Sequence, residues 1–118
     1  MKYLCMIFDD ESKWNTMSKE ESGKWMGEYG AFTKGIIDSG QFISGEALQP
    51  TASATTVRVR NGKISTTDGP FIETKEQLGG YYLIEARDLN EAIQVASKIP
   101  SARIGAIEVR PIMHTGGM

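Results

Sequence analysis

The sequence predicts a single α+β domain in which two strand–helix–strand units flank an inserted β-hairpin. Two segments, 18–39 and 88–99, carry apolar residues at helical spacing, and apolar or alternating runs typical of strands stand around them. The dipeptide Asn61-Gly62 indicates a tight hairpin turn between them. We therefore expect an antiparallel sheet that carries both helices on one face.

The first half of the chain predicts a strand, a long helix and a second strand. Residues 3–8 are continuously apolar, which favours a central strand buried on both faces. Ser18 is placed to cap the helix, and Glu21 stands three residues later, as a capping box requires. The helix ends before Gly40, and residues 41–48 form the next strand. One apolar stripe follows the helix: Trp25, Tyr29, Phe32 and Ile36.

A β-hairpin follows. Residues 55–60 alternate between polar and apolar side chains, and residues 63–67 return after the Asn61-Gly62 turn. This dipeptide predicts a turn in which both central residues have positive φ. The hairpin delivers the chain to Asp68.

The last third predicts a strand at residues 81–86, a helix that ends at Pro100 and a final strand at residues 105–112. Asp88 and Glu91 form a second capping box. The apolar stripe expected on this helix is Leu89, Ala92, Ile93, Ala96 and Ile99.

This element order is that of a ferredoxin-like split βαβ fold with a β-hairpin insert. Two helices cover one sheet face only, yet several strands lack a polar side, so a broad apolar face remains. We therefore expect a homodimer that packs sheet to sheet. We expect the domain to span residues 1–113 and residues 114–118 to form a flexible tail.

Composition excludes several classes of function. A net charge of −2 with interspersed signs gives no basic face for nucleic acid, and no apolar run is long enough to span a membrane. The single cysteine, Cys5, excludes an intrachain disulfide and suits the cytoplasm. With one histidine, His114, and no phosphate or dinucleotide fingerprint, we expect neither a metal nor a cofactor.

The candidate site centres on Asp68-Gly69-Pro70-Phe71. Gly69 tolerates positive φ and Pro70 fixes φ, so this turn holds the Asp68 carboxylate in one direction. The apolar bulk of Phe71 favours a buried anchor for the loop.

Other charged residues belong to the same candidate site. Glu73 is a second candidate acid, and Lys75 and Arg58 are candidate holders of an anion. Glu46 interrupts an otherwise apolar strand and is a third candidate acid. The preceding Gly45 indicates that another group approaches the strand closely there, or that the strand has a bulge. The acidic run at residues 9–11 is typical of a solvated strand end.

The chain resembles the YCII-related family in its DGPF-motif branch. The resemblance rests on Asp68-Gly69-Pro70-Phe71, Glu73-Thr74-Lys75-Glu76, Gly79-Gly80-Tyr81-Tyr82, Gly45-Glu46-Ala47-Leu48-Gln49-Pro50 and Glu108-Val109-Arg110-Pro111. It implies a dimeric α+β barrel, a poorly defined biochemical role and frequent proximity to sigma-factor genes. A His–Asp pair of smaller relatives has no counterpart here, because no early histidine exists.

Two functions follow from these observations. The first is a small-molecule-binding or regulatory dimer. The alternative is a small acid/base enzyme that uses Asp68, with Glu46 or Glu73 as the second carboxylate, for proton transfer or hydrolysis on a small organic substrate.

Overall fold

The computed structural model describes residues 1–114, so most of the tail expected at 114–118 lies outside the described residues. Among residues 1–114, no helix has the length and apolar character that a membrane span needs. The elements in chain order are β1 (Lys2–Asp9), α1 (Lys13–Thr16), α2 (Lys19–Asp38), β2 (Phe42–Ala47), β3 (Thr55–Arg60), β4 (Lys63–Asp68), β5 (Gln77–Glu85), α3 (Leu89–Ala96) and β6 (Ala106–Pro111), with 3₁₀ turns at Thr51–Ser53 and Pro100–Arg103.

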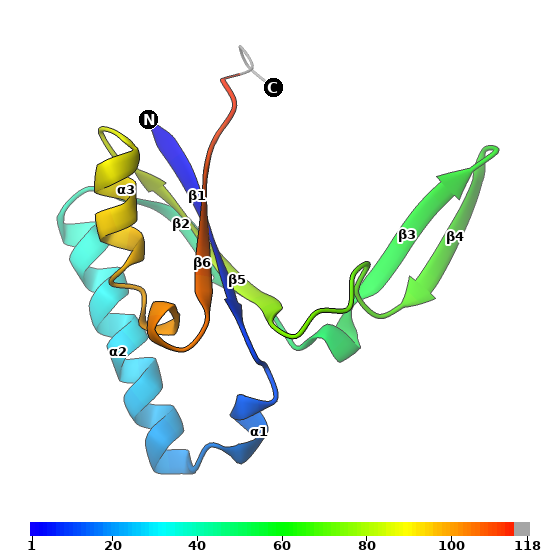
Figure 1. Ribbon diagram of the computed structural model, residues 1–118, viewed down its shortest axis with the longest axis horizontal. Helices are drawn as coiled ribbons and strands as arrows, with labels where there is room; N and C mark the ends of the chain where they lie inside the picture. The colour runs from blue at the N-terminus through cyan, green and yellow to red at the C-terminus, as the bar shows by residue number, and fades with distance from the viewer. Residues whose placement is uncertain (115–118) are drawn as a thin grey trace.

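Four strands form one antiparallel sheet in the order β2-β5-β1-β6. This order places β1, the first strand, between β5 and β6, the two strands of the second strand–helix–strand unit, which confirms the predicted ferredoxin-like α+β fold. Helices α2 and α3 lie together on one side of the sheet (Figure 1). The face toward the helices holds the core, whose buried members are Tyr3, Cys5, Ile7, Ile36, Tyr82, Ile84, Ala86, Ala92, Val95, Ala96 and Ile99.

The capping box of α2 is present. Ser18 Oγ accepts the N–H of Glu21, and the Glu21 carboxylate accepts the N–H of Ser18 in return. The stripe on this helix also faces the core, with Trp25 and Ile36 buried and Tyr29 and Phe32 half-buried. Helix α2 is therefore held by its local start signal and by one packed face.

Helix α3 differs from expectation in its stripe and its length. Leu89 and Ile93 are 49% and 46% exposed, whereas Val95 is buried. The helix ends at Ala96, and the chain continues as a 3₁₀ turn from Pro100. The small side chains of Ala92 and Ala96 face the sheet. In this orientation of the helix, Leu89 and Ile93 point outward.

Strand β5 begins earlier than the sequence suggested. The strand was expected to begin at Tyr81, but Gly79 and Gly80 also lie inside it. A Cβ at Gly80 would lie 2.8 Å from the carbonyl oxygen of Glu46, so glycine there permits the close approach of β2.

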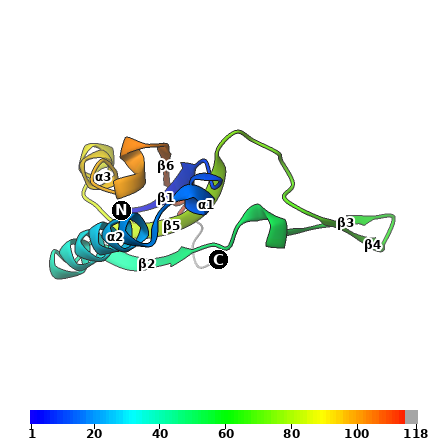
Figure 2. The same cartoon turned by 90° about the horizontal axis from the view of Figure 1, so that it is seen from below.

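The β3–β4 hairpin (residues 55–68, here called the arm) forms its own two-stranded sheet. Its turn has φ of 52° at Asn61 and 74° at Gly62, which confirms the predicted positive-φ hairpin turn. The arm projects away from the sheet on the side opposite the helices (Figure 2). The radius of gyration, 16.3 Å, therefore exceeds the value of about 13.5 Å typical of a compact chain of this length.

Candidate functional site

The sheet surface turned away from the helices is apolar at its centre. Register places residues directly opposite one another on the same side of the sheet, so Met6 shares this side with Tyr81 and Glu108. The apolar members of this surface, here called the open face, are Leu4, Met6, Phe8, Leu78, Tyr81 and Leu83. Leu78 is 39% exposed and the other five are half-buried, so the open face has no cover within residues 1–114.

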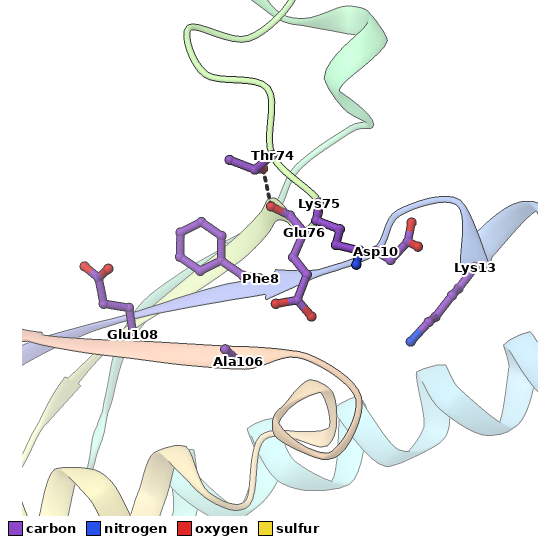
Figure 3. Close-up of a pocket in the computed structure, with 8 residues that line it drawn as sticks. All are labelled: Phe8, Asp10, Lys13, Thr74, Lys75, Glu76, Ala106 and Glu108. Carbon is purple, nitrogen blue, oxygen red and sulfur yellow. Dashed lines mark hydrogen bonds between the residues drawn. The ribbon is translucent and has the colours of Figure 1, made fainter.

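A hollow of about 600 Å³ lies at one end of the open face. This volume lies within the range of small-molecule sites. Strand β1, helix α1, the loop after the arm and strand β6 all contribute to it (Figure 3). Its lining residues are Phe8, Asp10, Lys13, Thr74, Lys75, Glu76, Ala106 and Glu108.

The hollow has an apolar floor. Phe8 and Ala106 stand opposite each other on neighbouring strands, and Leu78 stands opposite Phe8 on the other side. The small side chain of Ala106 leaves room above the sheet. At the adjacent Gly105, a Cβ would lie only 2.0 Å from the carbonyl oxygen of Phe8, so glycine is needed to bring β6 to this position.

Charged groups of both signs form the rim. Lys13 and Lys75 supply ammonium groups, and Asp10, Glu76 and Glu108 supply carboxylates. The Ser12 hydroxyl and backbone N–H both donate to Asp10, at 2.6 and 3.0 Å, and these bonds hold the pKa of Asp10 below its usual range. Asp10 is therefore ionised at neutral pH.

Hydrogen bonds fix the loop that borders the hollow. The Gln77 amide donates to the carbonyl of Thr74 at 2.6 Å, and its oxygen accepts the N–H of Glu11 at 3.0 Å. The Thr74 hydroxyl donates to the carbonyl of Glu76 (Figure 3). Lys75 and Glu76 are thus carried on a loop that is tied to the end of β1.

Beneath this end of the sheet lies a buried polar chain. Asp9 is only 4% exposed, and the Ser101 hydroxyl, 1% exposed, donates to its Oδ2 at 3.0 Å. The Ser101 oxygen lies 2.6 Å from the Tyr29 hydroxyl. Burial raises the pKa of Tyr29. The expectation that the run at residues 9–11 is solvated is therefore wrong for Asp9, because its side chain turns inward to Ser101.

The residues predicted around Asp68 are distributed along the arm and its loop. Asp68 is exposed at the end of β4 opposite Thr55, and Glu73 is exposed in the loop that follows. Gly69 has φ of +102°, as the turn chemistry predicted, and its N–H donates to the carbonyl of Ala54 at 2.7 Å. Of the candidates, only Lys75 lines the hollow.

Phe71 is not the buried anchor that its apolar bulk beside Pro70 suggested. It is 70% exposed, and the Arg58 guanidinium lies 5.2 Å from its ring centre. The ring packs on the basic side of the arm instead of entering the core, because the arm stands away from the body. The structure thus brings Arg58 and Phe71 together, apart from the residues that line the hollow.

Gly45 and Glu46 lie on β2. A Cβ at Gly45 would lie 2.8 Å from the Tyr82 ring, and the register of β2 shifts between Phe42 and Ser44. The close approach and the bulge, which were the two expected reasons for a glycine before Glu46, are therefore both present. Glu46 stands opposite Tyr81 on the open face, and strands β5 and β1 separate it from Glu108 on the other edge strand.

Sequence reasoning missed most of the hollow. Phe8 was expected only in a buried strand, and Asp10 in a solvated run. Lys13, Ala106 and Glu108 carry no local pattern, because their proximity arises from sheet order alone. Within residues 1–114, no three His, Cys, Asp or Glu side chains converge as a metal site would require.

Comparisons with known proteins place the chain in a family. The sequence model of the YCII-related domain matches residues 1–115. An uncharacterized protein of Rhizobium meliloti (strain 1021) is 38% identical over 114 residues, which cover 95% of this chain and 92% of that protein. The match extends over the sheet, both long helices and the arm, so the chain belongs to the YCII-related family.

Proposed function

We propose that this protein binds a small organic molecule in the hollow of the open face, as a homodimer without a catalytic step of its own. The observation that carries the proposal is the apolar floor of Phe8 and Ala106 beneath a rim of mixed charge. An apolar surface with a few convergent charged groups is the usual composition of a small-molecule site.

The lining defines the class of ligand. Phe8 and Ala106 suit a short apolar or aromatic body, and the ammonium groups of Lys13 and Lys75 suit a carboxylate on that body. The carboxylates of Asp10, Glu76 and Glu108 suit an amine. A small aromatic molecule with an ionised substituent fits both parts of the site.

The homodimer is supported by the open face. Beyond the hollow, the open face carries the apolar side chains of Leu4, Met6, Tyr81 and Leu83, which nothing within residues 1–114 of one copy covers. A second open face would remove both surfaces from water. The motif Asp68-Gly69-Pro70-Phe71 supports membership of the DGPF-motif branch. The lone Cys5, fully buried, supports a cytoplasmic location, where thiols stay reduced.

Ligand-observed NMR with benzoate, benzylamine and phenylalanine as probes tests the site. Ala106→Trp places an indole in the hollow and should weaken binding of the preferred probe by about tenfold or more. Ala52→Trp, at an exposed alanine of the Thr51–Ser53 turn, is the matched control and should leave binding unchanged. Binding of no probe, or equal loss in both variants, would refute the proposal.

Lysine variants then identify the charge that the site prefers. Lys75→Gln should weaken benzoate selectively if the rim holds an anion, whereas Lys19→Gln, on the exposed first turn of α2, should not. If Glu76→Gln instead removes the binding of benzylamine and leaves that of benzoate unchanged, the rim prefers a cation.

The acid/base alternative rests on Asp68. An acid/base carboxylate normally works in a partly dry cleft. Asp68 is exposed in one copy and lies outside the hollow, so the geometry favours the binding function first.

A further inference from the structure

The arm divides its side chains between an apolar and a basic face. Strand pairing sets Val57, Val59 and Ile64 on one side, at 60%, 56% and 75% exposed. The opposite side carries three cations: Arg58, Arg60 and Lys63. A two-stranded ribbon is marginally stable in water, and one with three exposed branched apolar residues needs a covering surface.

The base of the arm is well anchored. Glu11 accepts the N–H of Thr51 at 3.0 Å and also its hydroxyl. The Thr56 hydroxyl donates to the carbonyl of Gly69 at 2.9 Å. The Glu11 bonds tie the turn before the arm to the segment after β1, and the Thr56 bond ties the arm to the loop that follows it, so the base of the arm is held on both sides.

The arm cannot cover its own open face. It extends away from the four-stranded sheet on the side opposite the helices (Figures 1 and 2). Any molecule that covers the open face therefore also lies beside the arm.

Charge favours a second copy of this chain as that molecule. The arm holds three of the 13 basic residues and one of the 15 acidic residues, so the rest of the chain is more acidic than its net charge of −2 indicates. The border of the open face carries four acids, Asp10, Glu46, Glu76 and Glu108, among three cations, Lys13, Lys75 and Arg110. A basic arm is thus attracted to an acidic body of the same sequence.

We propose that each arm is a clasp that packs its apolar face against the other copy of a two-fold dimer. In a two-fold dimer, each copy contributes the same two uncovered apolar surfaces, the open face and the arm, so both surfaces are buried in both copies. It also holds the loop of Lys75 and Glu76, which begins at the arm, in place beside the hollow. The clasp stands whether or not the hollow binds a ligand.

Substitutions on the two faces of the arm test the clasp. Val59→Glu with Ile64→Glu buries two carboxylates in the proposed contact, and we expect the dimer dissociation constant to rise by about 100-fold or more. Ser65→Gln with Thr67→Gln adds side chains of the same length to the opposite face without altering its charge, and should change the dissociation constant by less than about fivefold. Analytical ultracentrifugation measures both, and circular dichroism verifies that the body stays folded.

Crosslinking identifies the contact directly. Ile64→Cys adds an exposed thiol near the tip of the arm, while Cys5 is buried and does not compete. A maleimide–benzophenone reagent on this thiol, in a mixture of ¹⁴N- and ¹⁵N-labelled protein, should give crosslinked peptides that pair the two isotopes. A dimer unaffected by Val59→Glu with Ile64→Glu would overturn the clasp while leaving the dimer intact. A monomeric wild type, or crosslinks confined to one isotope, would also overturn it.

Discussion

Removal of the Ser101 hydroxyl should destabilise the protein more than removal of the Tyr29 hydroxyl or of an exposed serine hydroxyl. Ser101 Oγ carries one hydrogen and donates it to the buried carboxylate of Asp9, so the hydroxyl of Tyr29 must donate to Ser101. Ser101→Ala therefore leaves a buried charge without its donor and a half-buried phenol without its acceptor.

The magnitude follows from these two losses. A hydrogen bond to a charged group contributes about 1.5–3 kcal/mol and an unpaired phenol adds about 1 kcal/mol, so Ser101→Ala should cost about 3 kcal/mol. For a chain of this size, about 4 °C per kcal/mol gives a fall in Tm of about 12 °C. Tyr29→Phe keeps the bond from Ser101 to Asp9 and should cost only about 1 kcal/mol.

Urea unfolding at one protein concentration measures these values. Ser97→Ala is the control, since Ser97 is exposed and its hydroxyl donates only to the carbonyl of Gln94 in its own helix. We expect the control to stay within about 0.5 kcal/mol of wild type. A Ser101→Ala protein as stable as the control, or a larger effect of Tyr29→Phe than of Ser101→Ala, would refute the reasoning.

Three further predictions concern the core, the arm and Asp68. Burial raises the pKa of Cys5 to about 11 from an ordinary value of 9.0, so the folded state retains this proton more tightly. The protonated thiol therefore makes its full contribution to the free energy of unfolding below pH 9, and this contribution is lost as the pH rises toward 11. Cys5→Ala should make the free energy of unfolding, measured in urea, fall less steeply over this pH range. An equal slope in both proteins would contradict a raised pKa for Cys5. Gly62→Val meets no atom within 4 Å, so its cost of about 1–2 kcal/mol comes from positive φ alone and should accelerate amide exchange in the arm by about 5- to 30-fold; unchanged exchange would show that the turn tolerates the branched residue. Asp68→Asn should keep stability within about 1 kcal/mol, because Asn also makes the turn. It should also leave probe binding in the hollow unchanged, whereas loss of a measurable activity would favour the acid/base alternative.

The sequence predicted the parts of the fold that local chemistry controls. The capping box of α2, the Asn61-Gly62 turn and the element order were each visible as short patterns, and each is present. Interactions distant in sequence were less visible. Gly80 was left outside the expected strand, because the reason for a glycine there is the close approach of β2 at Glu46, 34 residues earlier in the chain.

The candidate site was harder to predict for the same reason. The rigid turn around Asp68 and Phe71 was predictable from local sequence. That the arm extends away from the four-stranded sheet was not, because no local pattern indicates its direction. Phe8 and Ala106 meet only because β1 and β6 are neighbours in the sheet. Asp9 is buried only because Ser101, 92 residues later, supplies a donor.

Amide NMR mapping of the preferred probe on ¹⁵N-labelled wild-type protein tests most directly whether the hollow is a ligand site. We expect saturable shifts confined to the hollow, at Phe8, Asp10, Lys75, Glu76 and Ala106, and their loss in Ala106→Trp. Shifts that centre instead on Asp68 and Phe71, or that do not saturate for any probe, would contradict a ligand site in the hollow of the open face.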